Sequence, residues 1–462
     1  MAQKSKVDFS QGPVWKCILA QAMPLTVAQL VQLLYNVVDR IYLGHMGDGN
    51  SMALTGVGLT FPIITLIMAF TALFGVGGVP LFSMARGAGD TEKAGKILGN
   101  SFALLMSSAG ILMACGFLFC RPILFAFGAS EESYVYAKQY LDIYLLGTFF
   151  SMTTTGLNGY INAQGFPKIG MLSVLIGAVT NIILDPLFIF GLGMGVSGAA
   201  LATIIAQIVS ASLCMVKLAI MRKDYDFGLK FMIPRAQYIK TLVRLGLPSG
   251  LTQAIFSSAM IIVQSLTNQF GEQFIAANVV IMRVDGFAMM PNFTFGQAMS
   301  VYTGQNVGAG KFDRVTKGVK QGGLIAGAFS TCITVILLFC GKFLFALFTE
   351  TPELIDLATR MIRIMAVGYI CISVTQVLGG VMRGAGDTVS PMWISIISTI
   401  IIRVPLAYFL AHLTRNEEFP HGQPIALFGS LVSSWILGML ISIIVFSIGK
   451  WKKKMLESHD GE

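Results

Sequence analysis

The sequence predicts an all-α integral membrane protein with about 12 transmembrane helices, arranged as two six-helix lobes that repeat one pattern. Hydrophobic residues make up 55% of the 462 residues and charged residues only 12%, whereas soluble domains carry about 25% charged residues. The apolar residues gather in blocks such as 102–120 and 427–448, close to the ~20 residues that a helix needs to cross a bilayer. Ten-residue alternating segments, typical of outer-membrane barrels, do not occur in the sequence.

Each expected span is a long apolar run that ends at a polar or glycine-containing loop. Taken in chain order, these runs predict six spans in each half. The expected spans are 14–42, 52–80, 97–120, 135–160, 169–191, 196–219, 241–268, 274–303, 319–347, 357–382, 391–412 and 425–448.

Loop sequences recur in the same order in the two halves. The segment "ARGAGDTEKAGK" (85–96) follows the second span, and "VGAGKFDRVTKG" (307–318) follows the eighth. At the same separation, "GYINAQGFPKIG" (159–170) after the fourth span matches "GVMRGAGDTVSP" (380–391) after the tenth. A constant spacing favours duplication over chance. Parallel repeats of this kind are a known transporter design, with the binding site between them near the membrane midplane.

The duplication also sets the expected domain organisation. Near the start of the first and seventh spans, Pro24 matches Pro248 at nearly the same separation. The expected parts are an N-terminal lobe at 1–220, a cytoplasmic linker at 221–240, a C-terminal lobe at 241–450 and a cytoplasmic tail at 451–462.

Lys and Arg residues are concentrated on one side of the expected spans. The loops 85–96, 217–244 and 307–320 and the segment 450–454 carry most of them. Because basic loops stay on the cytoplasmic side, we expect a multi-pass protein of the plasma (cell inner) membrane with both termini in the cytoplasm. The net charge of +9 follows from this asymmetry, so we expect no nucleic-acid partner.

The residues that enzymes and nucleotide-binding proteins need are not grouped in this sequence. The seven cysteines lie mostly within apolar spans and the four histidines lie at loops or span ends, which predicts neither a catalytic dyad nor a metal cluster. The segment "QNVGAGKF" (305–312) lacks the leading Gly and the Ser or Thr after Lys311 that a P-loop requires. We therefore expect no enzyme activity, no ATP hydrolysis and no cofactor.

Two carboxylates stand inside spans of the first half. Asp39 lies late in the first span and Asp185 late in the fifth, so both fall in the outer part of the bilayer. Ionisable residues within spans cost about 2.5–3.5 kcal/mol on insertion scales and point to function. Asp39 corresponds to Val263, and Asp185 corresponds to the segment 400–409, which has no carboxylate. An acid required only by the architecture should occur twice, which favours a cation site in the first half; the alternative is an acid at a helix end or one paired with Arg40.

The surroundings of Asp185 suit H⁺ or Na⁺. A carboxylate among apolar groups takes up a proton more readily than one in water, and oxygen atoms of Asp, Asn and Thr can form a shell for a hard cation. Asn181 precedes Asp185 by one helical turn, so the two share a face. Pro186 cannot donate to the helix ladder and would free backbone oxygen beside the acid, although a plain proline kink is an equal alternative.

Further polar residues in the first half are weaker candidates. Gln32, Tyr35 and Asn36 lie on one helical stripe with Asp39. Thr203 could also face the site, but its hydroxyl can equally form a hydrogen bond with the backbone of its own helix.

Two more polar features could have a functional role, but each also has a simple structural explanation. Asn158 can cap a helix end. In the second half, Asp285 and Arg283 can neutralise each other, while the Met and Phe residues around them suit core packing.

The whole chain resembles the multidrug and toxic compound extrusion (MATE) family. The residues that carry the resemblance are "NVVDRIYLG" (36–44), the paired glycine-rich loops, "NAQGFPKIG" (162–170) and "NIILDPLFIFGLGMGVSGAALAT" (181–203). Acids in spans one and five resemble the DinF-like branch. The NorM-like branch is marked by acids in spans seven and ten, where this sequence has Gln253 and no acid in the core of the span.

The resemblance implies a V-shaped antiporter that exports organic, often cationic, drugs in exchange for H⁺ or Na⁺ by alternating access. It implies that the first span bends at Pro24 when its acid is protonated, and that the protein acts as a monomer in the lipid bilayer on small organic substrates. The implied cation site, which would hold the metal ion if the coupling ion is Na⁺, consists of Asp39, Asn181, Asp185 and Thr203. The implied drug cavity is lined by Gln32, Tyr35, Asn36 and Asn158.

Two other functions compete with this interpretation. A lipid-linked oligosaccharide flippase of the same wider superfamily would have extra spans and an arginine-lined cavity, whereas this chain has few arginines within its spans (Arg283 and Arg403). A channel is harder to exclude from the sequence. The duplication, together with an acid site in only one half, favours a transporter that works by alternating access.

Overall fold

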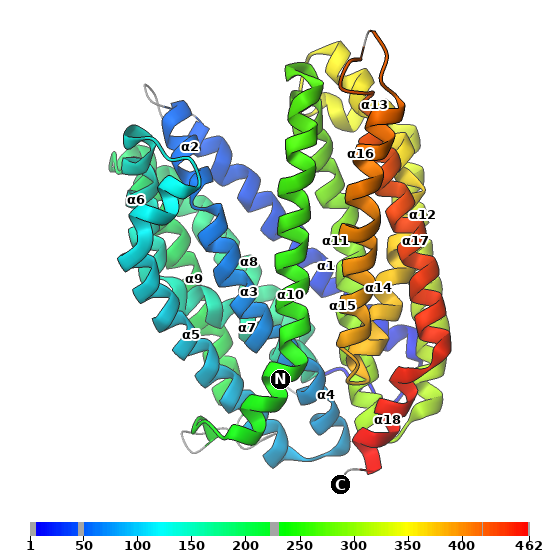
Figure 1. Cartoon of the computed structure of the whole chain (residues 1–462). Helices are drawn as coiled ribbons and strands as arrows, with labels where there is room; N and C mark the ends of the chain where they lie inside the picture. The colour runs from blue at the N-terminus through cyan, green and yellow to red at the C-terminus, as the bar shows by residue number, and fades with distance from the viewer. Residues whose placement is uncertain (1–5, 45–49, 222–230, 418, 461–462) are drawn as a thin grey trace. The chain divides into compact units, whose positions relative to one another are not determined.

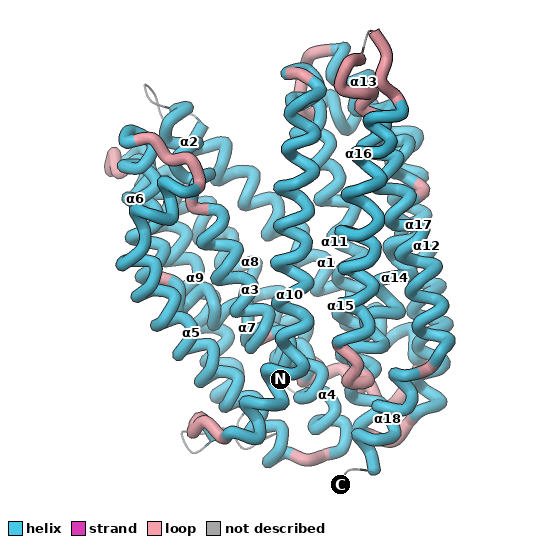
Figure 2. Tube along the Cα trace, viewed as in Figure 1, coloured by secondary structure: helices cyan, strands magenta, loops and turns pink. Residues whose placement is uncertain are grey.

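The computed structural model describes residues 6–44, 50–221, 231–417 and 419–460, and nearly all of them are helical (Figure 2). The described residues include no strand. In this part of the chain, ten helical segments are long and apolar enough to cross a membrane, or eleven if Pro352–Ala366 and Gly368–Gly384, bent by 44°, form one span. The protein is therefore an all-α multi-pass membrane protein, as the sequence predicts.

The chain folds into two compact units, and each takes most of one half of the sequence (Figure 1). Unit 1 comprises Met1–Val7 and Met23–Gly250, and unit 2 comprises Asp8–Ala22 and Leu251–Glu462. Residues 222–230 of the expected linker lie outside the described residues.

The unit boundaries fall within the first helix of each half. Helix α1 (Val14–Gly44) contains Pro24 and α10 (Ala236–Thr267) contains Pro248. The division of α1 falls between Ala22 and Met23, one residue before Pro24, and that of α10 lies two residues after Pro248. Since proline removes one hydrogen bond from a helix, both helices are weakened near the point where they pass from one unit to the other.

The helices of unit 1 follow the expected spans, with additional breaks. The expected second span is divided at Thr60 and again at Gly75, where the short helix η2 (Val76–Gly78) follows. The expected fourth span is divided at Gly147 into two helices of 16 residues each. The remaining elements are α2 (Asn50–Leu59), α3 (Phe61–Phe74), α4 (Val79–Ala88), α5 (Thr91–Ala126), α6 (Glu131–Leu146), α7 (Thr148–Ala163), α8 (Pro167–Pro186), the π-helical segment η3 (Leu187–Gly191) and α9 (Gly195–Ile220).

Unit 2 repeats this pattern, including the break in its expected tenth span at Val367. Its core is formed by apolar side chains from the last turns of α10 and from α11, α12, α13, α14, α16 and α17. Its elements after α10 are η6 (Asn268–Phe270), α11 (Glu272–Gly308), α12 (Phe312–Ala346), α13 (Pro352–Ala366), α14 (Gly368–Gly384), α15 (Val389–Ile396), the π-helical segment η7 (Ile397–Ile402), α16 (Arg403–Leu413), α17 (Ile425–Ile448) and α18 (Lys450–Asp460).

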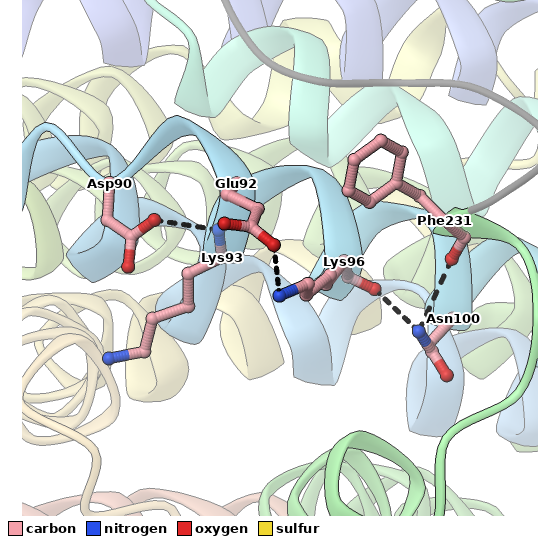
Figure 3. Close-up of polar contacts among 6 residues, drawn as sticks. All are labelled: Asp90, Glu92, Lys93, Lys96, Asn100 and Phe231. Atoms are coloured by element: carbon pink, nitrogen blue, oxygen red, sulfur yellow. Dashed lines mark hydrogen bonds and ion pairs between the residues drawn. The ribbon is translucent and has the colours of Figure 1, made fainter.

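Polar contacts at the start of α5 fasten the chain that leads into α10 (Figure 3). Asp90 caps α5 by accepting a hydrogen bond from the backbone N–H of Lys93 at 2.8 Å. Farther along α5, the Asn100 amide donates to the Phe231 carbonyl at 3.4 Å and accepts from the Arg235 N–H at 2.8 Å. A Cβ atom at Gly99 would lie 2.2 Å from the Phe231 carbonyl oxygen, so this close approach requires glycine. These contacts set the position at which α10 begins within unit 1.

Candidate functional site

Three of the predicted cation-site residues meet inside unit 1. The side-chain amide of Asn181 donates to Asp185 Oδ1 at 3.3 Å and to Thr203 Oγ1 at 3.5 Å. The three side chains are 1%, 0% and 8% exposed, respectively. Asn181 and Asp185 lie one turn apart on α8, and Thr203 comes from α9, so the sequence spacing correctly predicted the shared face on α8.

Small residues allow α9 to pack closely against α8 and its extension η3. The segment "GVSGAALAT" (195–203) places Gly198, Ala199, Ala200 and Ala202 in buried positions. A Cβ atom at Gly198 would lie 2.8 Å from the Phe188 carbonyl carbon. Because no large side chain separates the helices here, the short side chain of Thr203 can reach Asn181.

The helix changes form immediately after Asp185. Pro186 is the last residue of α8, and the chain continues as the π-helical segment η3. Proline lacks a backbone N–H, so the carbonyl of Ile182, one turn earlier, loses its usual intrahelical donor. Wide helical turns of this kind are frequent at functional sites, and here the turn follows the buried acid.

The second half of α1 brings Asp39 to the same region. Asp39 lies close enough to Asp185 for the two negative charges to repel each other, and it also lies near the neutral hydroxyl of Tyr140. Tyr35 lies near Asp39 and interacts with the side chain of Gln32. Asn36 differs from its neighbours because its amide donates to the Gln32 backbone carbonyl at 2.8 Å and is exposed. The side chain of Arg40, a proposed partner for the acid, lies outside the described residues.

Two tyrosines that the sequence reasoning missed complete the cluster. Tyr140 and Tyr144 lie one turn apart on α6, with ring centroids 6.0 Å apart and nearly parallel planes. The Tyr140 hydroxyl interacts with Thr203. Both tyrosines are buried. The available signal was the four-residue spacing of tyrosines in the expected fourth span, which places them on one helical face. Figure 1 shows α6, α8 and α9 gathered in this unit, and α9 contacts both of the other helices.

The cluster presents acceptor oxygens without donors. Within the described residues, Asp185 Oδ2 and Asn181 Oδ1 are buried and have no hydrogen-bond partner, and no Lys or Arg side chain there forms an ion pair with Asp185. Buried polar atoms normally find partners. Two such oxygens beside a second carboxylate therefore suit a proton or a small cation. No group of three His, Cys, Asp or Glu residues suited to a metal occurs in the described chain, so a Na⁺ ion here would depend on amide and hydroxyl oxygens as well.

Asn158 belongs to a different polar network. Its amide donates to the Gly170 carbonyl at 2.9 Å and to Ser173 Oγ at 3.0 Å, and its oxygen accepts from Asn162 at 2.8 Å. These contacts join α7 to the first turns of α8. The structure therefore does not bring Asn158 together with the Asp185 cluster, and the three hydrogen bonds give it a role in helix packing.

In unit 2, the pairing of Asp285 with Arg283 is wrong. Asp285 accepts a hydrogen bond from the Tyr369 hydroxyl at 2.7 Å and interacts with the charge of Arg403. Arg283 is exposed. The two residues stand two positions apart on α11, and residues at that spacing do not face each other on a helix.

Comparisons with known proteins agree with this architecture. The MatE family profile matches residues 24–187 and 248–409. The chain is similar to the probable multidrug resistance protein YpnP of Bacillus subtilis, with 25% identity over 451 residues that cover 97% of this chain and 98% of that protein. It is also similar to the multidrug export protein MepA of Staphylococcus haemolyticus, with 25% identity over 443 residues and 95% of each chain covered.

A solved structure extends the similarity to three dimensions. The crystal structure of a MATE protein in the straight conformation matches with a TM-score of 0.88 and 25% identity, covering 97% of this chain and 99% of that one. The family profile is matched once in each half of the sequence, as the duplication predicts. The chain therefore belongs to the MatE family, whose members are membrane transporters and not enzymes.

Proposed function

We propose that the protein is a secondary antiporter that exports small organic, often cationic, compounds in exchange for H⁺ or Na⁺. The observation that carries this proposal is the buried cluster of Asp185, Asn181 and Thr203, which has acceptor oxygens without donors and lies close to Asp39. The relatives described as multidrug resistance and multidrug export proteins support organic drugs as the substrate class.

The remaining features of the proposal follow from the duplication and the charges. Two repeated halves support alternating access, in which the cation site of the first lobe exchanges its ion as the substrate crosses. The first-span residues Gln32, Tyr35 and Asn36 are the proposed substrate-facing positions, with Pro24 as the hinge of α1. The basic loops support a plasma-membrane protein with cytoplasmic termini, acting as a monomer without ATP.

The negative charge of the site explains why one cluster can bind either the organic cation or the coupling ion. A buried carboxylate pair that has lost its ion attracts an organic cation, and one that has gained a proton or Na⁺ no longer does. Exchange of the coupling ion for the drug then follows from competition for the same negative charge. The absence of carboxylates from the corresponding positions in the second half supports a coupling site in the first lobe alone.

The test is transport by the purified full-length protein in proteoliposomes, with Na⁺ and pH gradients imposed separately. Ethidium serves as the organic cation, and its movement is followed by fluorescence. We expect one gradient to drive ethidium against its own gradient and its collapse to stop transport. Ethidium movement that responds to neither gradient, or only to added ATP, contradicts the proposal. Rapid movement down its own gradient alone would indicate a channel and would also contradict it.

A further inference from the structure

Residues 8–12, directly before α1, form a compact loop that belongs to unit 2. Asp8 Oδ1 accepts hydrogen bonds from the backbone N–H and the hydroxyl of Ser10, at 2.9 and 2.8 Å, which closes a turn through a side chain. Gly12 has a φ of +71°, a left-handed conformation that glycine adopts without strain. Phe9 is 0% exposed. The loop is therefore folded against unit 2 before the first helix begins.

Arg314 of α12 holds this loop by its backbone. Its Nη1 atom donates to the Gly12 carbonyl at 2.9 Å, and its Nη2 atom donates to the carbonyls of Phe9 and Gln11 at 3.1 and 3.2 Å. Its Nε atom donates to Asn306 Oδ1 at 3.1 Å, and the Asn306 amide donates to the Phe9 carbonyl at 3.1 Å. Because a guanidinium carries its donors in a rigid planar fork, one side chain fastens three carbonyls at once.

The fastened loop leads into the helix that carries one of the two proposed coupling acids. The first turns of α1 belong to unit 2, whereas the longer part that carries Asp39 belongs to unit 1. A Cβ atom at Gly322 of α12 would lie 3.4 Å from Ile18 Cδ1, so these first turns also pack closely on α12. Pro24 weakens the helix just beyond the division. One helix thus joins an anchored end in unit 2 to an acid in unit 1.

The corresponding helix of the second half provides a comparison. The first turns of α10 belong to unit 1, and Asn100 fastens the chain before them through the Phe231 carbonyl and the Arg235 N–H. That anchor is a neutral side chain, and α10 contains no carboxylate. Both halves therefore fasten the start of their first helix, but only α1 connects the anchor to an acid.

We propose that Arg314 is a positioning residue for ion-coupled transport, because it makes the first turns of α1 a fixed part of unit 2. Ion binding at Asp39 then acts on unit 2 along α1. The proposal rests on the proposed antiport function and assigns to Arg314 the transmission of the binding event. When the anchor is broken, the ion and the organic cation still bind in unit 1, but their exchange no longer drives transport.

Cys17 reports whether the anchor is closed. It is 6% exposed, and its Sγ atom lies 3.3 Å from the Gln11 carbonyl oxygen and 4.0 Å from Arg314 Nη2. The other six cysteines are replaced by Ala, and the labelling of the full-length protein in detergent by a water-soluble maleimide is timed. In Arg314→Gln we expect labelling at least about tenfold faster, because each hydrogen bond to a charged group contributes about that factor or more.

The same variants are compared in ethidium binding and in gradient-driven ethidium uptake by proteoliposomes. In Arg314→Gln, ethidium binding and its displacement by the coupling ion should stay as in the parent protein, since the proposed site lies in unit 1. Gradient-driven uptake should fall by about tenfold or more, the size of a typical coupling between two sites. A purely structural role would lower the amount of folded protein without separating binding from uptake.

Three matched variants separate the anchor from its charge and from general packing. Arg314→Lys keeps the charge but loses the planar fork, so its labelling and uptake should fall between those of the parent and of Arg314→Gln. Lys317→Gln removes an exposed charge from the next turn of α12 and should match the parent. Asn100→Ala loosens the start of α10 and should leave the ratio of uptake to binding unchanged.

Each outcome decides the proposal. Unchanged labelling in Arg314→Gln would overturn the anchor, and faster labelling with full uptake, or an equal loss of uptake in Asn100→Ala, would overturn its role in coupling. If Arg314→Gln does not fold, Gly12→Ala decides in the same assays, because a β-carbon strains the left-handed turn and should loosen the loop. A parent protein without gradient-driven uptake would reject the proposed function, whereas uptake that persists in the loosened variants would reject this inference alone.

Discussion

The substitution Asp185→Asn should separate the coupling role of the cluster from its structural role. Asparagine has nearly the same size and can still accept the hydrogen bond that Asn181 now gives to Asp185 Oδ1 at 3.3 Å. Only the negative charge is lost. At a separation of about 4 Å and an effective dielectric constant of about 20, one unit charge contributes about 4 kcal/mol to holding a cation. A loss of that size weakens cation binding by about a thousandfold, since each 1.4 kcal/mol is a factor of about ten.

The charge of Asp39 modifies this value. Because Asp39 and Asp185 repel each other when both are ionised, removing one charge also removes a repulsion. We therefore expect a net loss of affinity of at least about a hundredfold, equivalent to about 3 kcal/mol. The assay is gradient-driven ethidium transport in proteoliposomes at increasing concentrations of the coupling ion, with the amount of folded protein matched by size-exclusion chromatography.

The control is Asp142→Asn. Asp142 lies in the same unit on α6 and pairs with Lys138, so it tests for the general effect of losing a carboxylate. We expect its ion dependence to match that of the parent protein. Ion dependence in Asp185→Asn equal to that of the parent protein, at equal protein level, would refute the assignment of the coupling ion to this cluster.

Four further substitutions test the surroundings of the site. Asp39→Asn should abolish ion-driven ethidium efflux in cells at normal protein level, and full efflux would remove Asp39 from the cation site. Thr203→Val keeps the side-chain shape but removes one oxygen. Cation binding should then weaken by about fivefold, the size of one net hydrogen bond of ~1 kcal/mol; an unchanged ion titration would argue that the hydroxyl is not a ligand. Asn158→Ala should lower the free energy of unfolding by about 2 kcal/mol, because three intramembrane hydrogen bonds of ~0.6 kcal/mol are lost. A lower melting temperature in detergent would show this loss. The ion dependence of transport in liposomes should stay unchanged. Gly78→Ala would place a Cβ atom 2.1 Å from the hydroxyl of buried Tyr160, and such overpacking should cost about 1–3 kcal/mol, visible as a lower melting temperature that wild-type stability would contradict.

The long helices were predictable because each depends on a local property of the chain. A run of about 20 apolar residues forms a spanning helix wherever it occurs, and α17 has the expected bounds 425–448. The breaks were less predictable. Gly147 lies between α6 and α7 where α9 comes so close that a Cβ atom would lie 1.9 Å from the side chain of Ile204. That close approach is set by tertiary packing, which hydropathy along one segment does not contain.

The candidate site shows the same division between local and tertiary information. Asn181 and Asp185 were predicted together because they stand one turn apart on a single helix, and the structure joins them at 3.3 Å. Thr203 was carried over from the family resemblance. Tyr140 was missed because its contact with Thr203 crosses between α6 and α9. The unit boundaries near Pro24 and Pro248 were also missed, since the sequence alone assigns each of these helices to its own half.

The two halves of the chain act as internal controls for each other because their corresponding helices meet similar structural demands. Proline and an adjoining π-helical stretch occur in both the segment after Asn181 and the segment 400–409. A feature needed for the fold is expected to recur in this way. The charges do not recur, since the first half has Asp185, whose Oδ2 atom is buried without a hydrogen-bond partner among the described residues, and the corresponding segment of the second half has Arg403 and no carboxylate. We infer that the helix break belongs to the shared architecture and that the charge difference is what makes the two lobes unequal partners in transport.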